Sequence, residues 1–131
     1  MNRNYQTVLA LDTSSEICSV ALYCSGQLFS RQELKPNQHG DVILAMIESL
    51  LAENDLTFNT IDLIAFGQGP GSFTGLRIAA AVVQGLSFAY DIPVSPISSL
   101  QILAQATYEK TGAEKVFAAL DARKSEVYFG H

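Results

Sequence analysis

The sequence predicts an α/β fold, a mixed β-sheet whose later strands are followed by amphipathic helices. Stretches that are apolar at every position or at every second position alternate with stretches whose apolar residues recur every three or four positions. In addition, the first three strand-like stretches are separated only by short turns, while the later ones are separated by helices. Turns join antiparallel strands and helices join parallel ones, so the order βββαβα, continued by a further strand and helix, predicts a mixed sheet.

The composition indicates one well-packed unit that does not bind nucleic acid by itself. The chain has 131 residues, of which 48% are hydrophobic, enough to form a core and to exclude a disordered tail. Eight Lys and Arg against 13 Asp and Glu give a formal net charge of −5. An acidic surface repels phosphate backbones, which excludes a protein that holds a nucleic acid on its own.

No stretch predicts a membrane span or a signal peptide. The longest apolar run without a charge, 78–90, is shorter than the roughly 20 residues that cross a bilayer. Residues 1–7 are mostly polar, unlike a secretory signal. We therefore expect a cytoplasmic protein without membrane contact.

The first three strands are expected to form an antiparallel meander. Residues 7–11 are continuously apolar, and Asp12 opens the turn that follows them. Residues 17–24 alternate, Ser-Gly then predicts a hairpin turn, and residues 27–34 form the third strand. Cys18 and Cys24 are six residues apart on the second strand, so about 20 Å separates them. That distance excludes a disulfide, and we expect both to be small core residues on one sheet face.

Two helices follow, separated by a buried strand at 61–66. Residues 38–54 carry the apolar stripe of an amphipathic helix. Residues 75–90 form a helix that is apolar or small on nearly every side, which predicts burial on two sides. One side, expected to face the sheet, carries Ile78, Ala79, Val82, Val83 and Leu86. The opposite stripe, expected to meet another subunit, carries Arg77, Ala80, Ala81, Gln84, Ser87 and Phe88.

The last part of the chain predicts an edge strand, a third helix and a hairpin. Residues 94–97 contain Pro96, which suits an edge position. Ser98 and Gln101 form a capping box for a helix that stops at Gly112. Strands at 116–120 and 126–129 flank a charged turn, either a solvated tip or a polar junction contact. We expect residues 1–112 to be one lobe and residues 113–131 the first hairpin of a second lobe that is missing from this chain.

Two polar or glycine-rich stretches are candidates for binding a phosphate group. The loop 67–75, with Gly69 and Gly71, follows a strand and opens a helix, where backbone amides favour an anion. It matches neither the Walker pattern nor the dinucleotide-binding pattern. It is either a phosphate-binding loop or a tight turn in which Ser72 or Thr74 caps the helix.

The turn Asp12, Thr13, Ser14 has the same two interpretations. It either approaches a metal-bound phosphate or is a turn in which Asp12 caps the backbone. His39 and His131 are far apart in the sequence and have no partner residues at metal-ligand spacing. No Ser-His-Asp set can be drawn with them. We therefore expect no catalytic residue, no metal site and no cofactor.

Four stretches together resemble one family. They begin at Leu9, Gly67, Pro93 and Ala119 and read LALDTSSEICSVAL, GQGPGSFTGLRIA, PVSPISSLQILA and ALDARKSEVYFG. They resemble the TsaB (YeaZ) family, which is needed to make threonylcarbamoyladenosine in bacterial tRNA. The resemblance implies an actin/Hsp70-like (ASKHA) lobe and, since family members are longer, a second lobe.

The resemblance also implies a non-catalytic role. The related catalytic subunit, of the TsaD type, binds a metal through a His-x-x-x-His motif. Laid on this chain, that motif falls on Ser99 and Leu103, which cannot replace imidazole ligands. The leading hypothesis is therefore a scaffold or activating subunit; the alternatives are a nucleotide-binding ASKHA-type enzyme and a peptidase, for which no nucleophile and base can be assigned.

The partners implied by the resemblance are proteins. They are a TsaD-type catalytic subunit, a TsaE-type ATPase and a second copy of the chain, and tRNA is contacted only indirectly. We expect the pairing surface to lie on the first and second helices. Its candidate residues are Leu44, Glu48, Arg77, Ala80, Ala81, Gln84 and Phe88.

Overall fold

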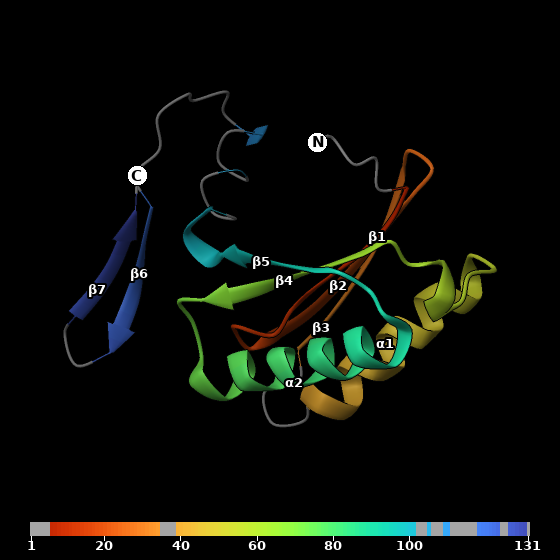
Figure 1. Cartoon of the computed structure of the whole chain (residues 1–131). Coiled ribbons are helices and arrows are strands. Elements are labelled where there is room, and N and C mark those ends of the chain that lie inside the picture. The colour runs from red at the N-terminus through yellow and green to blue at the C-terminus, as the bar shows by residue number, and fades with distance from the viewer. Residues whose placement is uncertain are drawn as a thin grey trace.

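The computed structural model describes residues 6–34, 39–101, 105, 109–110, 118–123 and 126–130, and it contains a five-stranded mixed sheet with two helices on one face (Figure 1). The elements of this layered part are β1 (Thr7–Asp12), β2 (Ile17–Cys24), β3 (Gln27–Leu34), α1 (His39–Glu53), the short 3-10 helix η1 (Phe58–Thr60), β4 (Leu63–Gly69), α2 (Phe73–Tyr90) and β5 (Val94–Ser98). A separate two-stranded sheet pairs β6 (Ala118–Arg123) with β7 (Glu126–Gly130).

The strand order β3-β2-β1-β4-β5 confirms the expected combination of a meander with parallel crossovers. β1 pairs antiparallel with β2 and parallel with β4. Ser25 and Gly26 have φ angles of 50° and 85°, as the two central residues of a type I′ hairpin turn require. β5 is an edge strand, so Pro96 removes no donor from an inner ladder.

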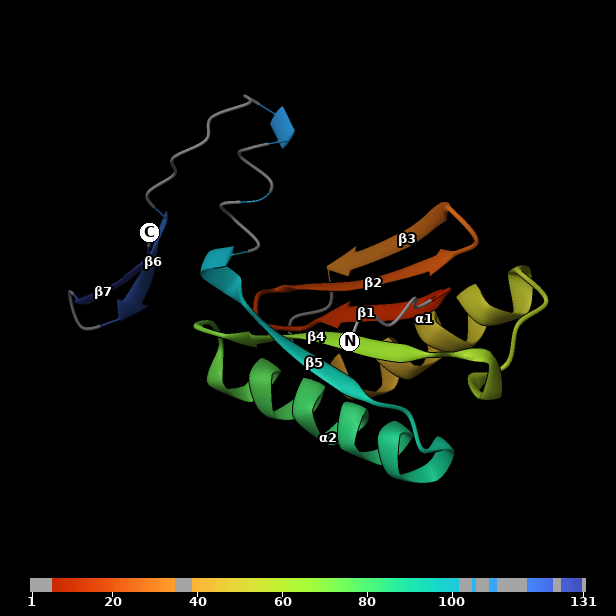
Figure 2. The same ribbon diagram turned by 45° about the horizontal axis from the view of Figure 1, so that its top comes forward.

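Both helices pack on the same face of the sheet, as Figure 2 shows. α1 covers β2 and β3, whereas α2 covers β4 and part of β1. The side chains between sheet and helices form one continuous apolar core. Its fully buried members include Leu9, Leu22, Ile43, Ile47, Ile64 and Val83.

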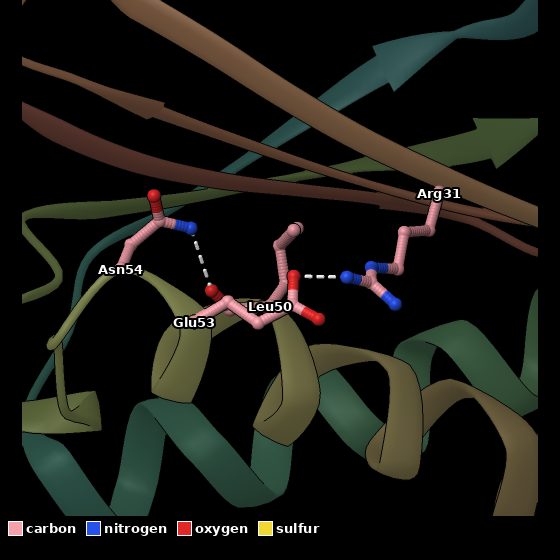
Figure 3. A network of polar contacts seen from close by, with 4 residues as sticks. All are labelled: Arg31, Leu50, Glu53 and Asn54. Carbon is pink, nitrogen blue, oxygen red and sulfur yellow. Dashed lines mark hydrogen bonds and ion pairs between the residues drawn. The ribbon is translucent and has the colours of Figure 1, made fainter.

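The end of α1 is tied to the edge strand β3. An ion pair joins the Arg31 guanidinium to the Glu53 carboxylate, both of them on the surface (Figure 3). At the next residue, the Asn54 side-chain amide donates to the Leu50 carbonyl at 2.8 Å. This amide satisfies a helix-end carbonyl that has no partner within the helix.

The cysteine prediction is correct for Cys18 and wrong for Cys24. Cys18 is buried in the core, and this burial, with a smaller effect of the Glu33 carboxylate, raises the pKa of its thiol. Cys24 lies at the end of β2 beside the hairpin turn and is only half-buried, with its Sγ 3.9 Å from the Thr7 hydroxyl. The two thiols are not joined, as the spacing predicts.

Three elements, β4, α2 and β6, have bounds that differ from the sequence expectation by two residues or more. β4 begins at Leu63 rather than 61 and continues to Gly69, because Gly67 and Gly69 still pair with β5 around a bulge. α2 begins at Phe73 rather than at Gly75. In the hairpin, β6 runs to Arg123, so the expected turn at 121–125 begins later.

The start of the third helix shows the expected capping box. The Ser98 hydroxyl accepts from the Leu100 amide at 3.1 Å, and the Gln101 side chain accepts from the Ser98 amide at 3.4 Å. Gly112 and His131 lie outside the described residues. The division into lobes at residue 112 stays a prediction, although the β6–β7 hairpin forms the small second sheet.

Candidate functional site

The β1–β2 turn and the glycine-rich loop, both proposed as phosphate sites, pack directly against each other. The Ser14 carbonyl accepts from the Ser72 amide at 2.7 Å. The Thr13 side chain is completely buried, and its hydroxyl donates to the Gly75 carbonyl at 2.5 Å. The Asp12 carboxylate accepts from the Ser14 amide at 2.7 Å, which is the turn-capping bond expected of an Asp at this position. We refer to these residues as the turn–loop junction.

Glycine is required at the turn–loop junction because two backbones approach closely. A Cβ atom at Gly75 would lie 1.8 Å from the Thr13 carbonyl oxygen. At Gly71 it would lie 2.6 Å from the Ser14 carbonyl oxygen, and at Gly67 2.7 Å from Asp12 Oδ2. At Gly71 and Gly75 the obstacle is backbone, which leaves no room for a side chain, so these two glycines serve the packing of turn and helix, whereas at Gly67 the Asp12 side chain would have to move.

Two amides of this loop, those of Ser72 and Gly75, are engaged within the protein. Ser72 is the N-cap of α2, and its hydroxyl accepts from the Gly75 amide at 3.3 Å. The Ser72 amide is bound to the turn, and the Leu76 amide donates to the Ser72 carbonyl at 2.8 Å. Of the two interpretations of the loop, the geometry favours the tight turn capped by Ser72.

The face of the sheet opposite the helices carries a shallow hollow of about 390 Å³. Its lining includes several small side chains, among them Ala10, Ala21 and Ala65. Asp12 borders it, next to Gly67 at the end of β4. Sequence reasoning missed this hollow, although alternate small residues on adjacent strands signal a shallow face.

The outer face of α2 is mostly exposed. Its inner side buries Gly75, Ala79, Val83 and Leu86, in agreement with the predicted core stripe, while Ile78 and Val82 are only half-buried. On the opposite side Arg77, Ala81, Gln84 and Phe88 are exposed and Ala80 is half-buried. The Phe88 side chain is 92% exposed. The proposed interface residues of this helix thus share one accessible face.

Phe73 belongs to the same face, and sequence reasoning missed it. Its side chain is 69% exposed, and the Arg77 guanidinium carbon lies 5.4 Å from its ring centroid. Such a distance is typical of a cation–π contact. Because the helix was expected to begin at Gly75, Phe73 was assigned to the loop. Its position four residues before Arg77 was the signal that could have placed it.

Two proposed interface residues lie on α1, the neighbour of α2 on the same side of the sheet (Figure 2). Leu44 is 40% exposed, and Glu48 one turn later is also exposed. The two helices therefore offer their accessible residues on one side of the molecule. No contact with another molecule tests their role, which stays a prediction.

α2 is also long and apolar enough to meet a criterion for membrane spans based on length and composition alone. Its 18 residues have a mean hydropathy of 1.2, and 22% of them are buried within the structure. The charge-free run 78–90 that the sequence analysis considers is only part of α2, which as a whole also includes residues 73–77 with Arg77. In the structure α2 packs on β4 and completes the core.

Comparison with known proteins connects this geometry to a family. A family model described as TsaD, tRNA N6-adenosine threonylcarbamoyltransferase, matches residues 32–131. Curated proteins named tRNA threonylcarbamoyladenosine biosynthesis protein TsaB are similar over almost the whole chain. The protein from Haemophilus influenzae is 53% identical over 94% of this chain and 52% of its own length, and that from Escherichia coli is 42% identical over 93% and 53%.

A solved structure has the same fold at high similarity. YeaZ from Pseudomonas aeruginosa superposes with a TM-score of 0.90 at 53% identity, over 95% of this chain and 59% of that one. The chain belongs to the TsaD domain family, as a member of the TsaB (YeaZ) type. The predicted ASKHA-like α/β lobe is thereby confirmed. The chain spans about half the length of the curated TsaB proteins that it matches.

The TsaD-type metal motif falls on two residues of this TsaB-type chain, Ser99 and Leu103. The structure describes only the first of them. Ser99 is buried, and its hydroxyl has no hydrogen-bond partner among the described residues. Leu103 lies outside the described residues. Within the described part of the chain, no three His, Cys, Asp or Glu side chains gather as they do around a metal ion.

Proposed function

We propose that the protein is a non-catalytic subunit in the formation of threonylcarbamoyladenosine in tRNA. In this proposal it acts in the cytoplasm, pairs with a TsaD-type catalytic subunit and supports that subunit's activity. A TsaE-type ATPase docks on the pair, and tRNA is held mainly by the other subunits. The involvement in this modification rests on the TsaB-type relatives, which match 93–94% of the chain.

The observation that supports pairing is the exposed outer face of α2. Burying a phenylalanine side chain contributes about 1.5–3 kcal/mol, a contribution that Phe88 does not make to the folding of this chain. Phe73 lies on the same side. Exposed aromatic residues grouped on one face mark interaction sites more often than single exposed side chains do.

The assignment of a non-catalytic role has a separate basis. The two positions that correspond to the metal-binding imidazoles carry Ser99 and Leu103, a hydroxyl and a hydrocarbon. Neither provides the nitrogen ligand on which a TsaD-type metal site depends. The packed turn–loop junction favours a structural role for the second candidate site, so nucleotide binding is not the function we propose.

The decisive experiment is a reconstitution of the modification with purified components. The full-length protein is mixed with the TsaD-type subunit, the TsaE-type ATPase, tRNA, ATP, threonine, bicarbonate and the enzyme that forms the carbamoyl-adenylate. We expect modified adenosine, measured by mass spectrometry of digested tRNA, to depend on the presence of this protein. Equal product without it would reject the proposal.

Two variants distinguish the proposed scaffold function from the alternative, a nucleotide-binding enzyme. Ala81→Glu places a charge on the outer face of α2. Because this charge should prevent pairing, we expect the variant to support no formation of modified adenosine. Asp12→Ala changes the turn–loop junction and is expected to leave product formation intact, provided that circular dichroism shows a folded protein. Micromolar ATP binding by the intact protein that is lost in Asp12→Ala would favour the nucleotide-binding enzyme instead.

A further inference from the structure

One edge of the five-stranded sheet is blocked against further pairing, and the other is open. At the first edge, β5 contains Pro96 and follows directly on Pro93, and proline has no backbone N–H to donate. At the other edge lies β3, which is eight residues long and contains no proline (Figure 2). None of the described strands pairs with the outer side of β3. An unpaired edge strand of this length is a template for pairing with another chain.

The hydrogen bonds of the meander determine which β3 residues direct their backbone groups outward. The Ser25 amide donates to the Gln6 carbonyl at 3.2 Å, which continues the ladder between β2 and β1. Along an antiparallel strand, successive residues bond alternately to the two sides. Odd-numbered residues of β2 therefore bond to β1, and even-numbered residues bond to their odd-numbered partners on β3. The backbone groups of the even-numbered β3 residues point outward. These residues are Leu28, Ser30, Gln32 and Leu34, and all four are exposed.

This outer edge is complementary to a second copy of itself. In an antiparallel pair with its two-fold axis at Arg31, Leu28 lies opposite the partner's Leu34, and Ser30 lies opposite the partner's Gln32. We propose that a second copy of the chain adds to β3 in this register, so that the two five-stranded sheets become one continuous sheet. The inference goes beyond the proposed function, because it does not depend on pairing through α2.

The position of the axis follows from the geometry of strands. Opposed residues must point to the same face of the joined sheet, so the axis passes through a residue and not between two residues. With the axis at Arg31, all four outward residues form hydrogen-bonded pairs. With the axis at Ser30 or Gln32, one leucine lies opposite Gly26 of the turn or opposite Pro36, so one pair fewer lies within the strands.

The side chains agree with this register. Leu28 is 69% exposed and Leu34 is 65% exposed, so these leucines contribute little to the folding of the single chain. Opposed apolar side chains on neighbouring strands stabilise a sheet, and this pair occurs twice. The two copies of Arg31 meet at the axis, where like charges would repel. Each guanidinium is already paired with the Glu53 carboxylate of its own chain, which offsets this repulsion (Figure 3).

The size of the contact predicts weak association. The eight residues of β3 extend over about 27 Å. A contact of this length and one strand wide buries far less than the roughly 800 Å² that each partner buries in a stable interface. We therefore expect a dimer that dissociates on dilution. Because β3 packs on α1 whereas α2 packs on β4 and β1, the outer face of α2 stays accessible in this dimer.

Cysteine cross-linking of the full-length protein tests the register directly. In a Cys24→Ser background, Arg31→Cys protein is oxidised. The two copies of residue 31 lie directly opposite each other, with about 4.5 Å between Cα atoms, which is within the range of a disulfide. We expect a covalent dimer.

Glu33→Cys in the same background is the matched control for the cross-link. Residue 33 lies on the same face of β3, but its two copies are four residues out of register, or about 14 Å apart along the strands. We expect this protein to stay uncrosslinked. No covalent dimer from Arg31→Cys, or equal amounts from both proteins, would overturn the proposal.

Charge variants test the same register in the reduced protein. They are made in an Ala81→Glu background, in which pairing through α2 is expected to be lost. Leu28→Glu or Leu34→Lys alone places a charge against the partner's leucine and is expected to weaken the dimer by about fivefold or more. In the double variant the introduced charges are opposite and meet twice across the axis, so the affinity should recover to within about twofold of the background protein.

Analytical ultracentrifugation gives the dissociation constants, and circular dichroism shows whether each variant is folded. A folded double variant without recovered affinity would contradict the register. A background protein that is monomeric at every soluble concentration would contradict the pairing itself.

The edge of β3 and the outer face of α2 are expected to act independently. Leu28→Glu protein should bind the TsaD-type subunit like the unchanged protein, as measured by co-purification. Ala81→Glu should lose that binding, yet it should leave the Arg31→Cys cross-link intact. Loss of the cross-link on addition of Ala81→Glu would show that the contact requires α2, and pairing at β3 would then be wrong.

Discussion

The start of α2 contrasts with its outer face: the start is packed closely against the β1–β2 turn, while most side chains of the outer face are exposed. At the start, the Thr13 and Ser14 carbonyls lie where any Cβ on Gly75 or Gly71 would collide. On the outer face, Phe88 is 92% exposed, and a Cβ added at Gly85 would meet nothing within 4 Å. Both regions are rich in small residues, yet for opposite reasons.

This difference shows that small residues have two uses in α2, one in folding and one at a surface where another molecule can bind. At the turn–loop junction small residues permit contacts that already exist within the chain. On the outer face they leave space that a second helix can use. A glycine-rich loop before a helix therefore does not by itself indicate a phosphate site, and the engaged amides of Ser72 and Gly75 decide between the two interpretations here.

The largest expected effect comes from adding one methyl group at the junction. Gly75→Ala places a Cβ 1.8 Å from the Thr13 carbonyl oxygen, so the backbone must move. We expect the free energy of unfolding to fall by about 3 kcal/mol or more. Gly85→Ala on the same helix is the matched control and should raise it by up to about 1 kcal/mol. Urea unfolding followed by circular dichroism measures both; equal effects would contradict the contrast.

The hydrogen bond beneath the junction should have the next largest effect. Thr13→Val keeps the shape of the side chain but leaves the Gly75 carbonyl without its buried donor, at an expected cost of about 1–3 kcal/mol. Thr7→Val is the control, because the Thr7 hydroxyl has only a long contact of 3.9 Å with the Cys24 sulfur. Thermal unfolding should show a clear loss for Thr13→Val and a small one for Thr7→Val. A reversed order would show that the junction is not held by this bond.

The other end of α2 offers a stabilising change. Asp91, the C-cap, has a φ of 54°, and its carboxylate lies at the negative end of the helix dipole. Asp91→Gly removes both disadvantages and is expected to raise the free energy of unfolding by about 0.5–1 kcal/mol. Pairing measured by ultracentrifugation should not change, because the residue lies beyond the outer face. A destabilised Asp91→Gly protein would mean that its side chain makes a favourable contact.

The smallest effect on folding is expected at the most exposed aromatic residue. Phe88→Ser removes no contact with the described core, so the free energy of unfolding should stay within about 0.5 kcal/mol. The measurement is made at concentrations at which the protein is monomeric, where pairing cannot contribute. A loss above 1 kcal/mol would show that Phe88 is part of the fold rather than of an interface.

Much of the fold follows from local sequence signals. The ends of β2 and β3 were predicted because Ser25 and Gly26 fix the hairpin and the alternation fixes the face. The wrong start of α2 and the wrong end of β4 have one cause. Glycines were interpreted as loop residues, whereas Gly67 and Gly69 continue a strand whose register depends on β5. That pairing is a long-range contact which local patterns do not contain.

The candidate sites, too, include features that follow from local sequence signals and features that depend on long-range contacts. The exposed stripe from Arg77 to Phe88 could be predicted, since helical periodicity alone assigns its side. The contact between Thr13 and Gly75 could not, because it joins residues 62 positions apart. Phe73 was missed through the boundary error rather than through any missing signal.

One binding measurement tests the central claim, that the outer face of α2 is the surface by which this protein pairs. The full-length protein, its Ala81→Glu variant and its Ala89→Glu variant are each titrated with the TsaD-type subunit by isothermal calorimetry. Ala81 lies on the outer face, whereas Ala89 is exposed on the flank of the same helix. The account predicts that the unchanged protein and Ala89→Glu bind alike and that Ala81→Glu does not bind. Unchanged binding by folded Ala81→Glu protein would contradict it.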